Sequence, residues 1–394
     1  MSKNFTSVMY TYPWDIVDEG IDTALSKITD LTGCTEVLLT PSYHVSNYFS
    51  PHNPLRPIHL GDNGAVYFQP EAERYAGIAI KPRVSPDVVD AAYFDRIVDA
   101  IRDRGLTFSA WIVYFFNHYV SSKYPEFAKQ DAFGTPYVGQ ISPSSESAQE
   151  YAVALTAEIM ERYQPHAVRI EALQRQMWRH GLLKNKFVGD ISERCQFLLG
   201  ICFNSASMAN AEEGGLDTQT FRDDVVEWLR PRMARLPRDE DLLPVDDHWL
   251  NEAFEGRLRQ YVDSLNSVTT TLWLRVAQVI KDAGGKVQSD YLTGPGRTWT
   301  NGLKPSINRE IDRLTVGTPS SAEELQSYLE MIATDGEVFV PVGPGNVLEA
   351  GPLIERTKDA KDVGAKGALF YNYGLLREEQ LGFVGQAVRA VSCD

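Results

Sequence analysis

Short apolar runs alternate with longer amphipathic segments along the whole chain. The apolar runs have the length of β-strands, and TEVLLT at residues 35–40 is almost continuously apolar, as expected of a strand covered on both faces. The amphipathic segments have the length and period of α-helices. This pattern predicts eight strands, at residues 5–14, 35–40, 107–114, 167–171, 286–291, 311–316, 337–342 and 367–373.

Helical segments separate these strands. We predict helices at residues 18–31, 86–104 and 147–163, and at about residues 191–208. Gly33 is placed to end the first of them, because glycine readily adopts the left-handed conformation that follows a helix. Between the fourth and fifth strands, residues 217–283 are expected to be mostly helix, with no separate set of apolar strands. A helical elaboration, or a βα unit with a weak pattern, would explain this segment.

The number of strand–helix units indicates the fold. Sustained alternation implies a parallel sheet, and eight units favour closure into a barrel. We therefore predict the α/β class and a (β/α)8 TIM barrel, as a single domain over residues 1–394 with insertions at about 41–82 and 217–283. An open, doubly wound sheet is the alternative. Its dinucleotide-binding form is disfavoured because no GxGxxG motif follows the first strand.

Charge and cysteine usage narrow the range of partners. A net charge of −15 argues against nucleic acid or an anionic membrane, since both require a basic surface. No basic and apolar signal-like segment precedes the first strand, and no apolar run reaches the roughly 18–20 residues of a membrane span. The four cysteines form no CxxC pair, which suits reduced thiols. We expect a cytoplasmic protein.

Polar and aromatic residues are concentrated where the predicted strands end. In a TIM barrel the reactive groups lie at the carboxyl ends of the strands and in the loops that follow. Hydroxyl-binding groups beside aromatic rings are typical of carbohydrate sites, because sugars offer both hydroxyls and C–H faces. We predict that the following residues bind a small carbohydrate substrate: Trp14, Tyr43, His44, Asn117, His118, Gln174, Arg175, Tyr371 and Tyr373.

Two carboxylates at these strand ends are candidate catalytic groups. Glu171 closes an apolar strand (AVRIE), and Asp290 ends the next one (KVQSDY). Glycoside cleavage commonly uses two such groups, one protonated and one ionised. A structural ion pair of Glu171 with Arg169 or Arg175, and a loop-ordering or helix-capping role for Asp290, are the alternatives.

A metal site is a competing interpretation of the same residues. His44, His118, Glu171 and Asp290 are all of types that bind a divalent ion. No HxH or HxxxH spacing supports such a site, so we expect no metal and no cofactor.

The middle of the chain carries several short motifs in a recognisable order. These are YPEF at residues 124–127, DAFG at 131–134, ISPS at 141–144, the strand ending in Glu171, and LLGICF at 198–203. In this order they resemble a group of glycoside-hydrolase-like (β/α)8-barrel proteins, over roughly residues 107–217. The resemblance implies a glycosidase-type barrel and places Glu171 at the acidic strand-end position of the group. This chain departs from it at Val168 and Arg169, where relatives often carry Asp-Gly, and at Asn204, where a second cysteine is common.

These observations lead to one principal hypothesis and two alternatives. We expect a glycoside hydrolase acting on a small glycoside or oligosaccharide, with Glu171 as general acid/base and Asp290 as nucleophile or second carboxylate. The alternatives are a metal-dependent sugar isomerase, epimerase or lyase, and a carbohydrate-binding barrel without catalysis. The sequence leaves open which sugar is bound and whether the chain works as a homo-oligomer.

Overall fold

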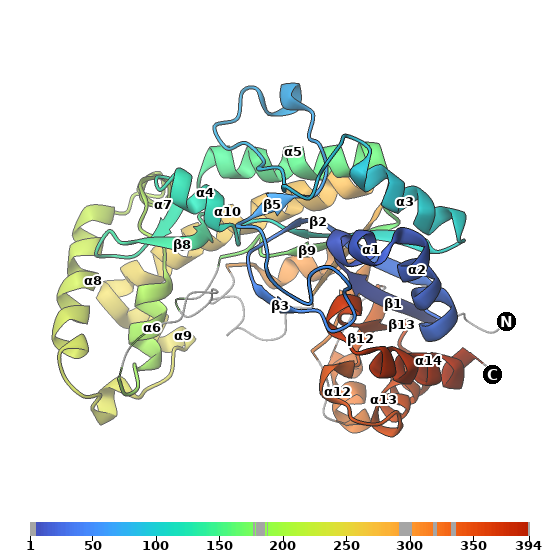
Figure 1. Cartoon of the computed structure of the whole chain (residues 1–394). Helices are drawn as coiled ribbons and strands as arrows, with labels where there is room; N and C mark the ends of the chain where they lie inside the picture. Colours follow the sequence, from blue (N-terminus) through green and yellow to red (C-terminus); the bar gives the residue numbers. More distant parts are fainter. Residues whose placement is uncertain are drawn as a thin grey trace.

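Eight parallel strands close into a barrel in the computed structural model, which confirms the predicted TIM-barrel fold (Figure 1). Residues 5–175, 178, 186, 188–290, 302–317, 321–331 and 336–392 are described. In order around the barrel the strands are β1 (Thr6–Thr11), β2 (Glu36–Tyr43), β6 (Thr107–Val113), β9 (Ala167–Glu171), β10 (Lys286–Asp290), β11 (Arg313–Thr315), β12 (Glu337–Pro341) and β13 (Gly367–Phe370). β13 pairs with β1 and closes the ring. Each of these strands falls at one of the eight predicted positions.

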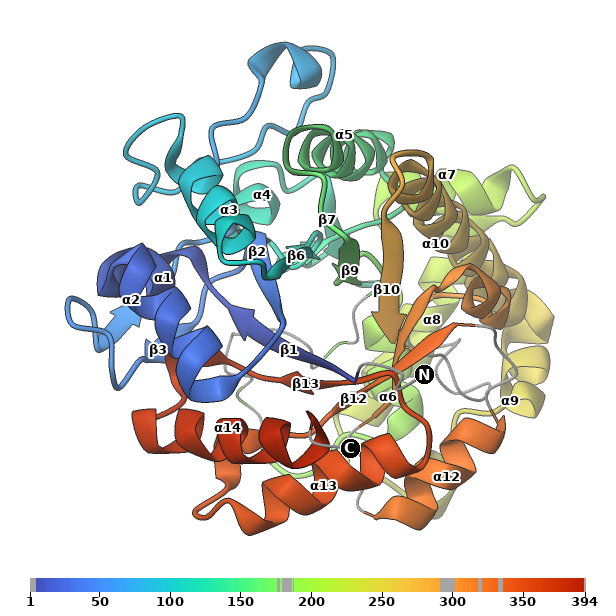
Figure 2. The ribbon, with the colours of Figure 1, turned by 90° about the vertical axis from the view of Figure 1, so that its right-hand side faces the viewer.

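Helices surround the ring of strands, as the view along the barrel shows (Figure 2). The helices of the outer layer are α1 (Pro13–Glu19), α2 (Ile21–Ser26), α3 (Tyr93–Asp103), α5 (Glu146–Tyr163), α10 (Arg257–Asp282), α12 (Ala322–Met331), α13 (Gly351–Asp362) and α14 (Glu378–Ser392). Their buried faces and the outward faces of the strands form one continuous hydrophobic core. Layers of this kind are what a parallel sheet requires, because both of its faces must be covered.

The first strand and helix have different bounds from those predicted. The apolar run continues to Trp14, but β1 ends at Thr11 and Pro13 begins α1. Proline favours the first turn of a helix, where its missing N–H costs nothing. Gly20 then separates α1 from α2 with a φ of 89°, and a π-helical turn continues to Gly33, whose φ is 67°. Trp14 therefore lies in a helix and not at a strand end.

Short antiparallel pairs elaborate the loops at the carboxyl ends of β2 and β6. The insertion after β2 contains the hairpin of β3 (Asn47–Phe49) and β4 (Ile58–Leu60), and β5 (Ala65–Val66), which pairs with the end of β2. The loop after β6 contains α4 (His118–Lys123) and the pair β7 (Ala128–Gln130) and β8 (Pro136–Ile141).

A helical lobe stands beyond the carboxyl ends of the strands, between β9 and β10 in the chain (Figure 1). It consists of α6 (Glu193–Gly200), α7 (Ser205–Glu212), α8 (Thr218–Met233), α9 (Asp247–Glu252) and the amino-terminal part of α10. It has its own hydrophobic cluster, in which Phe203 stacks on Tyr261 at 4.9 Å between ring centroids. The predicted helix at 191–208 is two helices, because Ile201 is extended and Asn204 caps α7.

A buried ion pair crosses the barrel near the amino-terminal ends of its strands. Arg313 on β11 donates to both carboxylate oxygens of Glu36 on β2, at 2.6 and 3.0 Å. The two strands lie on opposite sides of the ring, four positions apart, and both side chains are at most 4% exposed. This contact therefore links the two walls of the barrel at the end away from the predicted site.

The sequence predicted no membrane span and no disulfide framework. Among the described residues, no helix has both the length and the apolar composition required to cross a membrane. The three described cysteines, Cys34, Cys195 and Cys202, are buried and form no disulfide. Cys393 lies outside the described residues.

Candidate active site

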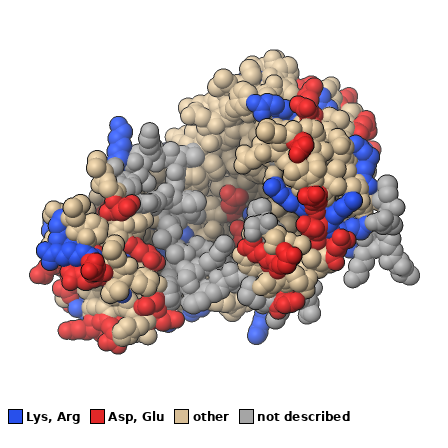
Figure 3. Space-filling view, turned by 90° about the horizontal axis from the view of Figure 1, so that it is seen from below, with Lys and Arg blue, Asp and Glu red and all other residues tan. Residues whose placement is uncertain are grey.

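A cavity of about 980 Å³ opens at the carboxyl ends of the barrel strands. Seen from below, the molecular surface is hollowed between the helical lobe and the barrel, and an acidic side chain is visible in the hollow (Figure 3). The cavity is lined by Tyr10, Tyr12, Tyr43, His44, Ser46, Asn47, Tyr48, Trp111, Phe116, Arg169, Glu171, Ala172, Gln174, Asp290, Thr315, Val316, Gly317, Pro341, Gly343, Leu369, Tyr371 and Leu375. All eight barrel strands contribute to this lining.

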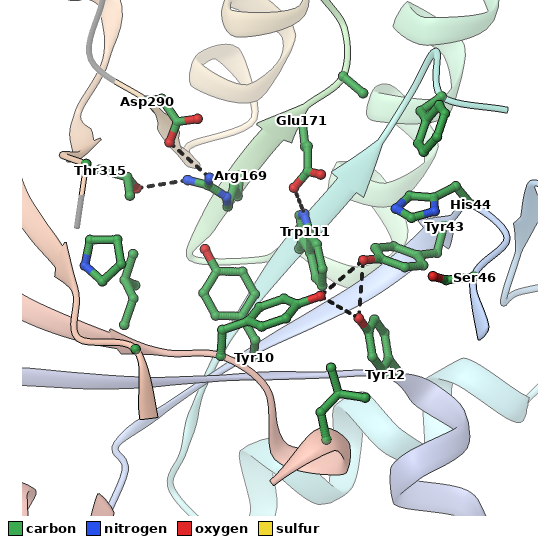
Figure 4. A pocket seen from close by; sticks show the side chains of 18 of the residues that line it. Tyr10, Tyr12, Tyr43, His44, Ser46, Trp111, Arg169, Glu171, Asp290 and Thr315 are labelled. Atoms are coloured by element: carbon green, nitrogen blue, oxygen red, sulfur yellow. Dashed lines mark hydrogen bonds and ion pairs between the residues drawn. The ribbon is translucent and has the colours of Figure 1, made fainter. Parts of the chain in front are cut away.

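Glu171 lies at the end of β9, on the cavity wall. The indole N–H of Trp111, on the neighbouring strand β6, donates to Glu171 Oε2 at 2.6 Å (Figure 4). Burial raises the pKa of the Glu171 carboxyl, while the charge of Arg169 and the Trp111 hydrogen bond oppose this effect and the charge of Asp290 adds to it. A carboxyl with a raised pKa retains its proton to higher pH, as a general acid must.

Arg169 connects β9 to the next two strands. Its Nη2 donates to Asp290 Oδ1 at 3.0 Å, and its Nη1 donates to Thr315 Oγ1 at 2.9 Å. Residues 169 and 171 are two apart on one strand, so both side chains point into the barrel. Asp290, whose side chain is 55% exposed, is held at the cavity wall by this ion pair.

Aromatic side chains of β1, β2 and β6 line the cavity next to these charged groups. The ring of Trp111 meets Tyr10 at 5.1 Å and Tyr43 at 4.7 Å between centroids, in edge-to-face geometry. Three of the tyrosine hydroxyls also meet. Tyr12 lies 3.2 Å from Tyr43 and 2.8 Å from Tyr371, and Tyr43 lies 3.4 Å from Tyr371, measured between hydroxyl oxygens (Figure 4). We call this group the hydroxyl triangle.

The hydroxyl triangle is uncharged. Burial raises the pKa of Tyr12, of Tyr43 and of Tyr371, and the charge of Glu171 raises the pKa of the latter two further. Each phenol therefore keeps its proton, so it can donate one hydrogen bond and accept one or two. Tyr12 and Tyr43 are buried, whereas Tyr371 is 43% exposed and is the most open member of the group.

The structure brings six of the eleven predicted site residues to this cavity. They are Glu171, Asp290, Tyr43, His44, Gln174 and Tyr371. His44 donates from Nδ1 to the carbonyl of Val45 at 2.9 Å, and its ring stacks on Tyr43. Tyr291, the last residue of the predicted fifth strand, lies outside the described residues.

Two predicted residues belong to the first turns of helices and do not line the cavity. Trp14 is buried in α1, stacked on Tyr12 with 4.4 Å between ring centroids, and it is not among the lining residues. Asn117 is the amino-terminal cap of α4, where its side-chain oxygen accepts from the Val120 N–H at 2.9 Å. Trp14 therefore supports the cavity wall indirectly, through Tyr12.

Three further predicted residues are buried elsewhere. His118 packs against Gly139 in the α4–β8 region, and burial lowers its pKa. Arg175 faces the helical lobe, with its guanidinium carbon 6.0 Å from the centroid of the Phe197 ring, and burial lowers its pKa to about 10. Tyr373, in the segment that follows β13, donates to Glu19 and lies edge-on to His52. None of the three lines the cavity.

Several lining residues were not singled out in the sequence. Tyr10 and Trp111 lie before their strand ends, and Arg169 was considered only as a partner of Glu171. Side chains alternate along a strand, so residues two and four positions before an inward-pointing end also face the barrel interior. Applying this alternation to VMYTY and to AVRIE identifies Tyr10 and Arg169.

Among the described residues, no group of three or more His, Cys, Asp or Glu side chains is placed to hold a metal ion. The acidic groups of the cavity are instead engaged by Trp111 and Arg169.

Comparison with known proteins gives a clear result at the level of fold. No family model matches the chain, and no curated protein matches it in sequence. Solved structures do match. The catalytic domain of β-amylase from Paenibacillus polymyxa has a TM-score of 0.55 and 11% identity, with all of both chains covered.

Two further matches are a β-galactosidase and an α-L-fucosidase. The β-galactosidase from Marinomonas ef1 has a TM-score of 0.57 and 10% identity, covering 98% of this chain and 59% of the other. The α-L-fucosidase isoenzyme 2 from Paenibacillus thiaminolyticus has a TM-score of 0.55 and 11% identity, covering 98% and 49%. This chain thus spans about half of each of these two proteins. At such identity the likeness establishes a shared fold, the TIM barrel of glycoside hydrolase domains.

Proposed function

We propose that this protein is a glycoside hydrolase that cleaves a small glycoside or oligosaccharide with Glu171 as general acid/base. The observation that carries the proposal is the placement of Glu171. It is a carboxyl with a raised pKa at a strand end, in a large cavity that also contains a second carboxylate and an aromatic wall. The likeness in fold to glycoside hydrolase domains also supports glycoside hydrolysis as the reaction.

Each side chain has a definite role in the proposed reaction. Glu171 donates its proton to the oxygen of the leaving group as the glycosidic bond breaks. Asp290, on the adjacent strand, acts from the same wall as nucleophile or as the base that activates water. Arg169 holds Asp290 in position through its 3.0 Å contact. Trp111 fixes the Glu171 carboxyl through Oε2, which leaves Oε1 to carry the proton.

Turnover by the variant Glu171→Gln tests the proposal directly. The amide has almost the same shape and can still accept from Trp111, but it cannot transfer a proton. We expect kcat/KM to fall by about 100-fold to 10,000-fold, the usual contribution of general acid–base catalysis, with the melting temperature largely retained. The assay is a screen of aryl glycosides that differ in sugar and anomeric configuration.

A matched control separates catalysis from charge. Glu349→Gln makes the same chemical change at an exposed position in the loop after β12 and should leave turnover unchanged. Normal turnover by Glu171→Gln would refute the assignment. Sugar binding by the wild-type protein with no turnover of any glycoside would indicate a non-catalytic carbohydrate-binding barrel instead.

A further inference from the structure

The hydroxyl triangle has hydrogen-bonding capacity that its own contacts do not exhaust. Three phenols supply three protons, and a closed ring of three contacts uses each proton once and leaves one acceptor position on each oxygen. The Tyr43–Tyr371 contact, at 3.4 Å, is longer than a normal O–H···O bond. One proton is therefore readily turned toward a ligand, and the triangle can donate one hydrogen bond while accepting another.

This pattern suits an alcohol. A sugar hydroxyl both donates and accepts one hydrogen bond, so it complements the open side of the triangle at Tyr371. A carboxylate, sulfate or phosphate only accepts, and it binds best to several donors or to a cation. The rings of Tyr10 and Trp111 beside the triangle offer apolar surface for the C–H groups of the same sugar.

The charged side chains of the cavity also favour an uncharged ligand. Arg169 is the only arginine or lysine among the described lining residues. Its guanidinium already contacts Asp290 and Thr315, at 3.0 and 2.9 Å. An anionic sugar would have to displace Asp290 from Arg169 or lie close to Glu171 and Asp290, and each alternative costs free energy.

From these contacts we propose that the cavity takes the uncharged glycon of a glycoside, one hydroxyl of which binds at the hydroxyl triangle through Tyr371. This inference deepens the proposed hydrolase function and rests on the same cavity. It excludes glycosides of uronic acids and of sugars that carry sulfate or phosphate. It also makes Tyr371 a specificity-determining residue, which Tyr12 and Tyr43 hold in place.

Binding to the variant Glu171→Gln tests this inference separately from catalysis. The probes are methyl glycosides of glucose, galactose, mannose and fucose, and the uronates that match the first three, measured by titration calorimetry. We expect at least one neutral glycoside to bind, and its uronate, where there is one, to bind at least about tenfold more weakly.

The triangle itself is tested by removing one hydroxyl from each side of the contact. Tyr371→Phe should weaken binding of the neutral glycoside by about tenfold. One deoxy analogue of that glycoside should bind about tenfold more weakly than the parent sugar to the protein that retains Tyr371. In Tyr371→Phe the same deoxy change should weaken binding little further, because the two changes remove the same hydrogen bond. Tyr114→Phe removes a buried hydroxyl that bonds Thr156 at 2.8 Å, outside the lining residues, and should leave binding unchanged.

The outcomes separate the two proposals. Binding of none of the neutral glycosides, tighter binding of a uronate, or unchanged binding by Tyr371→Phe would each overturn the inference about the substrate. If the neutral glycosides bind as expected but the wild-type protein cleaves none of them, the inference stands and the hydrolase proposal fails.

Discussion

Trp111 and Glu171 are joined by a 2.6 Å hydrogen bond across two neighbouring strands. The indole N–H stabilises the charged form of the carboxyl and so lowers the pKa of Glu171 against the effect of burial. Trp111→Phe removes this donor and keeps most of the ring. The pKa of Glu171 should then rise, and the alkaline limb of the pH dependence of kcat/KM should move up by about one pH unit.

The direction of that shift distinguishes positioning from packing. Trp273→Phe makes the same change in α10, at a buried position that does not line the cavity, and should leave the pH profile in place. A Trp111→Phe enzyme with lower activity but an unmoved alkaline limb would show that the indole N–H does not control the Glu171 proton.

The candidate site could be predicted from the sequence where one side chain at a strand end decides the outcome. Glu171 and Tyr43 end β9 and β2, and Asp290 ends β10, so the position alone brings them to the cavity. Asn117 shows what such reasoning misses. It follows a strand, but its side chain caps α4, and this use of the amide depends on where the helix begins.

At the scale of elements, the alternation of short strand-length runs with helical segments predicted all eight strands. The bounds of the helices could be predicted less accurately from the sequence. α1 begins at Pro13, inside the apolar run of the first strand, and the helix predicted at 191–208 is interrupted at Ile201. These breaks depend on local backbone conformation and on packing within the helical lobe, which a hydrophobic pattern does not encode.

The Arg313–Glu36 pair gives a prediction at the same scale, because it ties β11 to β2 across the barrel. Glu36→Gln leaves the buried Arg313 with only the Glu337 carboxylate, 3.6 Å from its Nε, as a countercharge. We expect the free energy of unfolding to fall by about 3 kcal/mol. The double variant Glu36→Leu/Arg313→Met removes both charges and should recover most of that loss. Urea unfolding monitored by tryptophan fluorescence measures both. A single variant as stable as the wild type would show that the pair contributes nothing to barrel closure.

At the scale of the whole molecule, stability and pH are linked through a buried carboxyl near the amino terminus. Asp15 is 2% exposed, its Oδ1 has no hydrogen-bond partner among the described residues, and the backbone of Gly374 packs directly against it. Burial raises the pKa of Asp15 to about 7, although the backbone N–H of Tyr12 and the charge of His52 oppose this. In the unfolded chain the same carboxyl titrates near its ordinary value of 3.8.

The sign of the effect follows from these two values. Below about pH 4 Asp15 is protonated in both states and favours neither. As the pH rises toward 7 the unfolded state ionises first, so the contribution of Asp15 to stability is progressively lost. Asp15→Asn cannot ionise and should gain stability relative to the wild type by about 2–3 kcal/mol between pH 5 and pH 8. Asp103→Asn, an exposed change at the end of α3, controls for the altered net charge. Urea unfolding at several pH values measures the difference, and a constant difference between Asp15→Asn and the wild type would show that Asp15 titrates alike in both states.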